Sequence, residues 1–412
     1  MQDKRRDFDD RDFTDHVGAQ CASLAGLWRE AAEQAEASEA ARALSPVLAG
    51  ALAAADYFSL YVPHAIGGPE LSPLEANARL FHLARHDAAS AWVSMIGSTA
   101  SLGAAYMDRK TAADIFIGEG RITCGIFAPN GTARKDGDDF LVSGRWAWAS
   151  GSANADYIGL GCRVIDADHA AEKSKTPETR LVMVPMAALV KHDNWHTIGL
   201  CGSSSGDVEA HDIRVPQAHG FSVREGHDWP ETPLYKMPYF GLLASGIGAV
   251  ALGNSRAALD DFYDMAAHKT PMGTTRPLAQ RGGVQTALAQ AEAEWQAAFA
   301  YYGQVLQTTW RAAQAAQAAQ AAQAGRAGEA AGLAPTQKAD LRLMATHAVQ
   351  KSVAVVRAVH DLAGGSSVYK TSPIQRRLRD SETITQHMMT NQASYELVGR
   401  VRLGGYEAGM LL

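Results

Sequence analysis

The chain is poor in the residues that build disulfide frameworks and metal clusters. It has four cysteines in 412 residues, namely Cys21, Cys124, Cys162 and Cys201. None of them forms a C-x-x-C pair or has a histidine at zinc-finger spacing, so we expect no metal site. Scattered cysteines are typical of a reducing compartment, and the charged start MQDKRRDFDDRDF does not resemble a secretory signal. We therefore expect a cytoplasmic protein.

Long apolar runs and large basic clusters are also missing. No stretch of 18 apolar residues is free of polar interruption, which predicts no membrane span. The net charge is −6 and the basic residues are scattered, so we expect no nucleic-acid partner. No G-x-G-x-x-G follows a predicted strand, which argues against a Rossmann site for NAD. With 47% hydrophobic and 20% charged residues, the chain has the composition of an ordinary globular protein.

The composition and the turn residues along the chain predict three regions. In residues 1–120, the stretch from Asp15 to about Ala55 is rich in alanine and glutamate, and Ser72 and Pro73 supply an N-cap and a first-turn proline for a helix. Residues 121–228 alternate short β-rich runs with Gly, Asn and Asp turns, which is typical of a small antiparallel β domain. Residues 229–412 are helical again. The predicted fold class is α+β and mostly helical.

Four long helical segments are expected in the third region, as in a helix bundle. They cover residues 240–268, a stretch that starts at Gly282, residues 335–363, and a last segment from Pro373 to about Arg402. The tract AAQAAQAAQAAQ begins at residue 312, and its three-residue repeat drifts around a 3.6-residue helix without forming a stripe. We interpret residues 312–333 as an overlong helix end and a connector.

The last of these segments contains a histidine in a polar setting. In RRLRDSETITQHMMTNQ, His387 lies seven residues after Asp380, which is about two turns along a helix and on roughly the same face. Taken alone, a single histidine of this kind is more often a hydrogen-bonded helix residue than a catalytic one.

Four stretches, in chain order, resemble the acyl-CoA dehydrogenase fold. They are LYVPHAIGGPELSPLEANARLFHLARHDAASAWV (60–93), FLVSGRWAWASGSANAD (140–156), WHTIGLCGSSSGDVEAHDIRVP (195–216) and LAGGSSVYKTSPIQRRLRD (362–380). The resemblance covers nearly the whole chain. It implies an N-terminal helical domain, a middle antiparallel β-barrel domain and a C-terminal four-helix bundle.

Within this fold, GRWAWASG is most similar to the oxygenase components of two-component flavin-dependent monooxygenases. The chain also lacks what a dehydrogenase needs, which is a carboxylate to remove the α-proton of a thioester. No acid occurs from Thr383 to Tyr395 or from Thr232 to Leu259, the two places where dehydrogenases of this fold keep that base. The resemblance therefore favours oxygen chemistry through a C4a-(hydro)peroxyflavin.

Two residues match catalytic positions of these monooxygenases. Ser150 aligns with a serine that contacts flavin N5, and a hydroxyl can donate or accept a hydrogen bond there. His387 aligns with a histidine near flavin and substrate, where an imidazole can accept a phenolic proton or donate to a peroxide. The structural alternatives are a strand-end serine and an ordinary helix histidine.

The resemblance also implies walls for a flavin and for a substrate. Trp148, on the same predicted strand as Trp146, would wall the flavin. Trp92 would shape the substrate pocket or belong to the core, and Tyr239 belongs to an apolar stretch that suggests an aromatic or apolar substrate. Thr99 stands at or next to a position where many relatives have a histidine, so any phenol activation would depend on His387.

Flavin anchors are implied on both sides of the cofactor. Phe127, Ala128 and Asn130 would lie on the flavin-side strand. Because proteins of this fold share the flavin between subunits, Arg276 would reach a phosphate from a neighbour, or else be an ordinary loop charge. Backbone amides would come from Gly364, Gly365 and Ser366. We expect FMN rather than FAD.

These expectations define one function and three alternatives. The predicted protein is a homotetrameric oxygenase component that takes reduced flavin from a separate reductase and uses O2 to hydroxylate or oxygenate a small, aromatic or apolar molecule. The alternatives are an acyl-CoA dehydrogenase-type flavoenzyme, an N- or S-oxygenating relative, and a catalytically silent flavin-binding protein.

Overall fold

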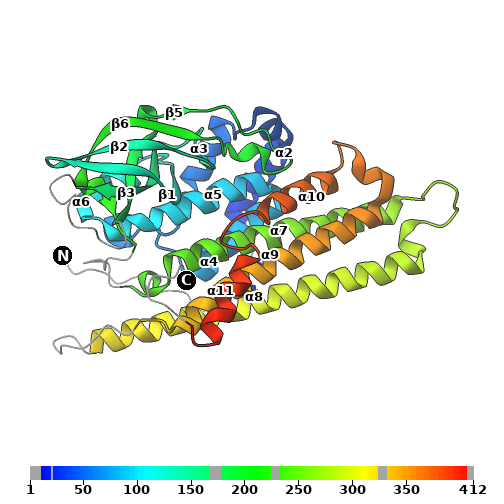
Figure 1. Cartoon of the computed structure of the whole chain (residues 1–412). Coiled ribbons are helices and arrows are strands. Elements are labelled where there is room, and N and C mark those ends of the chain that lie inside the picture. The colour runs from blue at the N-terminus through cyan, green and yellow to red at the C-terminus, as the bar shows by residue number, and fades with distance from the viewer. Residues whose placement is uncertain (1–10, 20–21, 167–177, 224–231, 323–331, 406–412) are drawn as a thin grey trace.

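A computed structural model describes residues 11–19, 22–166, 178–223, 232–322 and 332–405. In Figure 1 a sheet lies towards one end of the molecule, and long helices run side by side away from it. The order of helices, sheet and helices confirms the predicted fold class. Cys21, residues 1–10 of the charged N-terminal stretch and the predicted boundary at residue 228 lie outside the described residues.

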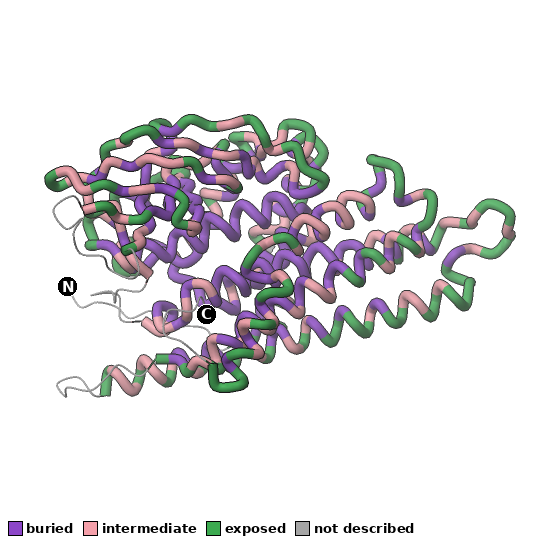
Figure 2. Tube along the Cα trace, viewed as in Figure 1, coloured by how far each residue is buried: buried purple, intermediate pink, exposed green. Residues whose placement is uncertain are grey.

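Six α-helices of the described residues precede the sheet. They are α1 (Phe13–Gly18), α2 (Ala25–Ala41), α3 (Pro46–Ala54), α4 (Pro73–His86), α5 (Ala88–Ser101) and α6 (Arg109–Phe116). The predicted cap of α4 is present, because Ser72 Oγ accepts from the Glu75 backbone N–H. Asp87 then ends α4 and caps α5 through the Ser90 N–H. Every residue of α5 is buried, which makes it a core helix (Figure 2).

In the part of the chain that the structure describes, seven strands form one sheet in the order β5-β6-β2-β1-β3-β4-β7. Their bounds are β1 (Thr123–Asp136), β2 (Asp139–Trp146), β3 (Tyr157–Ile165), β4 (Thr179–Pro185), β5 (Val190–Lys191), β6 (Val208–Pro216) and β7 (Gly220–Phe221). The prediction of an antiparallel sheet is wrong for one pair, since β1 and β3 are parallel. The reason is that the connection after β2 returns the chain to the start of β1, where the Asp156 N–H bonds the Ile122 carbonyl at 2.8 Å.

β1 bulges where it passes β3. Ile126 pairs with Leu160, but the next paired residue, Gly131, lies opposite Cys162. Residues 127–130 therefore stand outside the ladder with β3, and the paired register with β2 begins only at Thr132. Such a bulge redirects side chains and leaves the backbone groups of the bulged residues without partners on the neighbouring strand.

The C-terminal region contains the long helices α7 (Tyr239–His268), α8 (Gly282–Ala322) and α9 (Pro335–Ala363), then α10 (Pro373–Ile384) and α11 (Ala393–Arg402). α7 lies at the centre, between α9 and the N-terminal helices α4 and α5. Close approach requires glycine there: a Cβ on Gly253 would lie 2.3 Å from the Phe81 carbonyl oxygen. The described part of the AAQ tract continues α8 as helix.

By length and composition α7 could cross a membrane, and it is the single helix of the described residues that passes this test. However, 94% of its most apolar stretch is buried inside the protein. A core helix has the same properties, so this finding is weak evidence for a membrane span.

The predicted single helix from Pro373 to about Arg402 is wrong. α10 ends at Ile384, and a turn over residues 385–392 precedes α11. Local side-chain bonds compete with the helix there, because Thr385 Oγ1 donates to the Glu382 carbonyl and His387 Nδ1 accepts from the Met389 N–H. His387 therefore lies in a turn and does not share a helix face with Asp380.

Candidate active site

A cavity of about 610 Å³ lies between the sheet and the helices. Its walls come from α5, β1, the segment after β2, β4, β7, the start of α7 and the turn after α10. Six aromatic side chains line it, namely Trp92, Phe127, Trp148, Trp195, Phe221 and Phe240. Among the described residues that line it there is no aspartate and no glutamate. The cavity is thus a mainly apolar chamber of a size typical for small-molecule sites.

Ser150 is held in this wall by a chain of hydroxyl groups. Its Oγ accepts a hydrogen bond from Trp92 Nε1 at 3.1 Å and lies 2.7 Å from Ser205 Oγ. Ser205 Oγ lies 2.6 Å from Ser203 Oγ, and all three serines are buried. Because either oxygen can donate in each serine pair, the chain can run in two directions. If Ser205 donates to Ser150, the hydroxyl proton of Ser150 is available to a ligand. If Ser150 donates to Ser205, a lone pair of Ser150 is available instead.

His387 reaches the same cavity from the far end of the sequence. Its ring meets that of Trp92 edge-on, with centroids 5.6 Å apart. Burial lowers the pKa of His387 to about 4, and the nearby Arg342 guanidinium contributes in the same direction. The ring is therefore neutral at pH 7. Since Nδ1 accepts from the Met389 N–H at 3.2 Å, the remaining proton is on Nε2.

Trp148 has an unusual backbone and an unusual exposure. The strand β2 ends at Trp146, so the two tryptophans do not share a strand as predicted. Trp146 is fully buried, and its Nε1 donates to the Gly161 carbonyl. Trp148 has φ +66° and is 71% exposed while lining the cavity. A bulky residue in the left-handed region is strained, and such strain is common at functional sites.

The β1 bulge supplies part of the opposite wall. Phe127, Ala128 and Pro129 line the cavity, whereas Asn130 is exposed and lies outside its wall. The chamber fits the ring system of a flavin, because it has flat aromatic walls, backbone outside the sheet ladder and a hydroxyl at Ser150 that can donate or accept. Phe127, Ala128, Trp148 and Ser150 are the residues of this chain that would hold the rings.

Two predicted substrate-pocket residues lie behind the wall. Thr99 is buried in α5, and its Oγ1 donates back to the Met95 carbonyl instead of facing the cavity. Tyr239 is also buried and packs edge-on against Phe127 and Phe240, with ring centroids 5.3 and 5.7 Å apart. The structure therefore removes Thr99 and Tyr239 from the cavity wall and places Phe240, from the same apolar stretch as Tyr239, in it.

The predicted phosphate and amide anchors lie at the other end of the bundle. Arg276 is exposed in the connection between α7 and α8, and Gly364, Gly365 and Ser366 follow α9. Lys269 Nζ donates to the Ala363 carbonyl, which ties these two connections together. Neither group lines the cavity of the same chain. Their predicted role in a neighbouring subunit's flavin site stays a prediction.

A buried carboxyl supports the loop that carries the serine chain. Asp380, on α10, accepts a hydrogen bond from the Leu200 N–H at 2.6 Å. Leu200 has φ +50° and lines the cavity. Burial raises the pKa of Asp380 to about 7. The adjacent Gly199 lies so close to α10 that a Cβ would be 2.0 Å from the Arg379 carbonyl oxygen.

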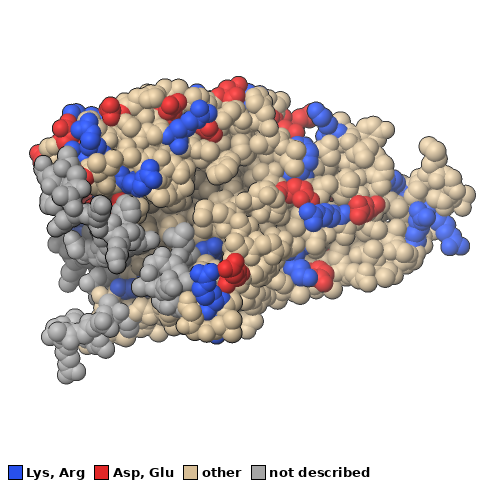
Figure 3. Space-filling view, in the orientation of Figure 1, with Lys and Arg blue, Asp and Glu red and all other residues tan. Residues whose placement is uncertain are grey.

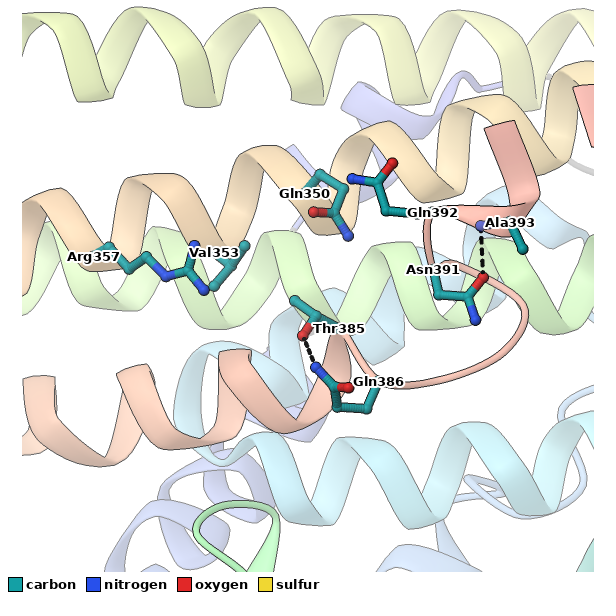
Figure 4. A pocket seen from close by; sticks show the side chains of 8 residues that line it. All are labelled: Gln350, Val353, Arg357, Thr385, Gln386, Asn391, Gln392 and Ala393. Carbon is teal, nitrogen blue, oxygen red and sulfur yellow. Dashed lines mark hydrogen bonds between the residues drawn. The ribbon is translucent and has the colours of Figure 1, made fainter. Parts of the chain in front are cut away.

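A second pocket, of about 350 Å³, lies between α9 and the turn after α10 (Figure 4). Its side chains are mostly polar, and they include Gln350, Arg357, Asn391 and Gln392. It shares Gln386 with the main cavity. The turn that carries His387 therefore separates an apolar chamber from a polar one.

The face of the molecule seen in Figure 3 gives no comparable signal. On the face in Figure 3, basic and acidic side chains lie next to each other and neither sign gathers into a large patch. Surface ion pairs among the described residues include Arg357 with Glu382 and Arg214 with Asp139. Pairs of this kind contribute little stability.

Sequence reasoning missed several residues of the cavity. Ser205, which lines the cavity, and its hydrogen-bond partner Ser203 belong to the run GSSSG, where a cluster of hydroxyl residues was the available signal. Leu200 and Trp195 lie just before that run, and Trp195 Nε1 donates to the Leu200 carbonyl at 3.0 Å. Arg180, on β4, gave no sequence signal, because an arginine on a strand is usually a surface residue.

Comparison with known proteins agrees with this geometry. Residues 245–392 match the family model described as acyl-CoA dehydrogenase, C-terminal domain. A solved structure of butyryl-CoA dehydrogenase from Megasphaera elsdenii covers 97% of this chain and 100% of its own, with 15% identity and a TM-score of 0.73. The HsaA monooxygenase from M. tuberculosis covers 98% and 100%, with 21% identity and a TM-score of 0.82.

Two relatives are more similar in sequence. An indole-3-acetate monooxygenase of Pseudomonas putida is 28% identical over 347 residues, which is 83% of each chain. The oxygenase component of an FADH2-dependent resorcinol hydroxylase from Rhizobium sp. is 27% identical over 400 residues, which is 93% of each chain.

The chain therefore has the acyl-CoA dehydrogenase fold and a C-terminal domain of that type, as the sequence resemblance predicted. Within that class, its sequence is similar to oxygenase components of flavin-dependent monooxygenases.

Proposed function

We propose that this protein is the oxygenase component of a two-component, flavin-dependent monooxygenase. The observation that carries the proposal is the composition of the cavity wall, which has no carboxylate among its described residues. A dehydrogenase of this fold needs a base at the substrate carbon. Here the corresponding segment contributes His387, Met388 and Met389 instead. Oxygen transfer needs no such carboxylate.

Reduced flavin in this cavity would supply two electrons to O2, so that one oxygen atom enters the substrate and the other leaves as water. The protein's part is to hold the ring system, to exclude water and to place hydrogen bonds. Trp148 and Phe127 provide flat apolar walls. Ser150 offers a hydroxyl whose partners, Trp92 and Ser205, fix its position while leaving its direction adjustable.

His387 acts in this proposal as a hydrogen-bond donor. With a neutral ring and Nδ1 engaged by the Met389 N–H, its Nε2–H is the group available to a ligand. Of the two roles inferred from the sequence, donation therefore fits the geometry better than acceptance of a phenolic proton. Donors aimed at developing negative charge contribute strongly in a dry site.

The cofactor form, the partners and the location are further parts of the proposal. We expect a separate reductase to deliver the reduced flavin, because the relatives of similar sequence include an oxygenase component. FMN remains our expectation, although that relative is FADH2-dependent, so both flavins belong in the test. A homotetramer would bring Arg276 and the turn at 364–366 to a neighbouring cavity. A cytoplasmic location is likewise a prediction.

The direct test is incorporation of oxygen from ¹⁸O2. The protein is mixed anaerobically with reduced FMN or reduced FAD, then with ¹⁸O2 and either indole-3-acetate or resorcinol, and the products are examined by mass spectrometry. We expect one ¹⁸O atom in the product of at least one probe, and none in a reaction without protein. Reduction of bound oxidised flavin by butyryl-CoA, with no ¹⁸O in any product, would overturn the proposal in favour of a dehydrogenase.

A further inference from the structure

A buried arginine contacts the turn that carries His387. Arg342 belongs to α9, is 3% exposed and is not one of the residues that line the cavity. Burying a guanidinium costs free energy even when it is hydrogen-bonded, and burial lowers the pKa of Arg342 to about 10. A charge is not needed merely to pack this part of α9 against α11, since Ala339, Val398 and Val401 form an apolar cluster there.

The guanidinium bonds to two points of the chain after α10. Its Nε donates to the Met389 carbonyl at 3.2 Å, and Nη2 donates to Ser394 Oγ at 3.1 Å. Ser394, in the first turn of α11, also donates from its Oγ to the Met389 carbonyl at 3.0 Å. All three residues are buried, and these two bonds are among the interactions that offset the burial of Arg342. Because the fork of an arginine is planar, it fixes the end of the turn and the start of α11 relative to α9.

Met389 passes this restraint on to the histidine. While its carbonyl accepts from Arg342, its own N–H donates to His387 Nδ1 at 3.2 Å. The next N–H, of Thr390, donates to the His387 carbonyl at 3.0 Å. The ring and the backbone of His387 are therefore both tied to the segment that the guanidinium holds. The bond at Nδ1 also leaves the ring proton on Nε2.

The local chain offers little else to fix this ring. Residues 385–392 lie between α10 and α11 and have no regular helical hydrogen bonds. In Figure 4 this turn runs beside α9, from which Arg342 reaches Met389 across 47 residues of sequence. The edge-on contact with Trp92 limits where the His387 ring can lie, but it does not decide which nitrogen carries the proton.

We propose that Arg342 is a positioning residue, which holds Met389 so that the His387 ring presents its Nε2–H to the cavity. Its importance for the reaction rests on the proposed function, whereas its restraint on the turn does not. Arg342 has no part in contacting a ligand, because it lies outside the cavity wall.

Hydrogen exchange of the protein without flavin, followed by mass spectrometry, tests the restraint. Arg342→Met should speed exchange in the turn at residues 385–392, which includes the Met389 N–H, by about 10- to 100-fold, as for loss of a hydrogen bond to a charged group. Arg342→Lys should have a smaller effect, because an ammonium group can keep one of the two bonds. Ser352→Ala is the matched control: Ser352 is buried on α9, but its Oγ accepts from Ser255 Oγ of α7. Its turn should exchange as in wild type.

A second variant tests the same restraint if Arg342→Met does not fold. Ser394→Ala removes one acceptor of the guanidinium and one donor to the Met389 carbonyl. We expect the turn to exchange about 3- to 10-fold faster in this variant.

The reaction tests whether Arg342 acts through His387. Product per reduced flavin should fall about tenfold in Arg342→Met and be partly rescued in Arg342→Lys. The double variant Arg342→Met/His387→Ala should match His387→Ala within about twofold, because a residue that acts through the ring has no further effect once the ring is gone. The Ser352→Ala change should leave product per flavin unchanged.

Three results would overturn the positioning role. They are unchanged exchange of the turn in both Arg342→Met and Ser394→Ala, faster exchange spread evenly over α9 and α11, and losses that multiply in the double variant. If the turn exchanges faster as expected but the protein incorporates no ¹⁸O, the restraint by Arg342 stands while the proposed function fails.

Discussion

Ser150 and His387 come from distant parts of the sequence, and both contact Trp92. The indole N–H of Trp92 holds the serine, and the edge-on contact of the two rings holds the histidine. Substitutions of these two residues therefore test the chemistry of the site most directly.

Replacing Ser150 by alanine should uncouple the reaction. The hydroxyl is the polar group that the Trp92 bond fixes in the wall, so we expect product per reduced flavin to fall by at least about tenfold. Release of hydrogen peroxide should rise correspondingly. A peroxidase-coupled assay beside product quantification measures both. Ser152→Ala is the matched control, because Ser152 lies in the same turn but its Oγ donates to the Ser204 carbonyl. Equal coupling in the two variants would remove Ser150 from the mechanism.

His387 variants should separate donation from packing. His387→Ala removes the Nε2–H and should lower product per flavin by about 10- to 100-fold. His387→Gln keeps a side-chain N–H and should lose less. Steady-state turnover with quantified product checks this order. A glutamine variant as poor as the alanine variant would mean that the imidazole is needed for another reason.

The lowered pKa of His387 also predicts how stability depends on pH. Below about pH 6.5 the unfolded chain takes up a proton on this residue, whereas the folded chain does not until about pH 4. Its contribution to stability is thus full above pH 6.5 and is lost as the pH falls towards 4. The Tm of wild type should drop more between pH 7 and pH 5 than that of His387→Gln, as measured by differential scanning fluorimetry. If the Tm values of the two proteins fell in parallel with pH, this would contradict a neutral, buried His387 ring in the folded chain.

At the scale of elements, the contact between α10 and the loop after β5 supports one side of the cavity. Asp380 and Gly199 make this contact. Gly199 directly precedes a residue of the cavity wall, and Asp380 accepts a hydrogen bond from that same residue. The serine chain and Leu200 depend on the same loop. Changes there should affect the site without touching a ligand.

Gly199→Ala should push the loop away from α10. A Cβ placed 2.0 Å from the Arg379 carbonyl oxygen cannot be accommodated without a backbone shift, so we expect a loss of about 1–3 kcal/mol in unfolding free energy. Flavin affinity should fall too. Urea unfolding and fluorescence titration measure the two effects. Gly399→Ala, in α11 with no atom within 4 Å of the added Cβ, should be neutral or stabilising.

Asp380→Asn should stabilise the protein selectively at high pH. The folded chain holds the Asp380 proton up to about pH 7, whereas the unfolded chain loses it near pH 4. This contribution to stability is therefore full below about pH 4 and is lost as the pH rises through 7. Asp87 reinforces the raised pKa, while Arg376 and Arg379 oppose it.

Asparagine can still accept the Leu200 N–H bond but avoids the buried charge. The gain in Tm over wild type should therefore be larger at pH 8 than at pH 5. Asp361→Asn, at an exposed position, serves as the control. An equal gain in Tm at pH 8 and at pH 5 would contradict the raised pKa of Asp380.

At the scale of the whole molecule, the cavity lies far from the predicted phosphate and amide anchors, Arg276 and residues 364–366, of the same chain. If Arg276 and the turn at 364–366 contact a flavin, a second chain must bring them to it. We predict a homotetramer, which light scattering should detect as four times the 43.9 kDa chain mass. A monomer that binds flavin with full affinity would contradict both the assembly and the role of Arg276.

Much of the architecture was predictable because its signals are local. Ser72 and Pro73 start α4, Pro335 starts α9 and Gly364 ends it, as capping chemistry requires. The end of α10 was missed, since no glycine or proline marks it and side-chain bonds of Thr385 and His387 close the turn instead. The parallel pairing of β1 and β3 was missed because strand order is decided by contacts between distant segments.

By itself, the sequence determined the succession of helices, β segment and long helices, and the lack of an acid where a dehydrogenase has its base. These follow from local propensity and from residue identity. Only the tertiary structure decided which polar groups face the cavity. Ser150, His387 and Arg180 line it, whereas Thr99 and Tyr239 are buried behind its wall. Burial, tautomer and charge in a cavity depend on neighbours supplied by distant parts of the chain, and for that reason no single stretch of sequence specifies them.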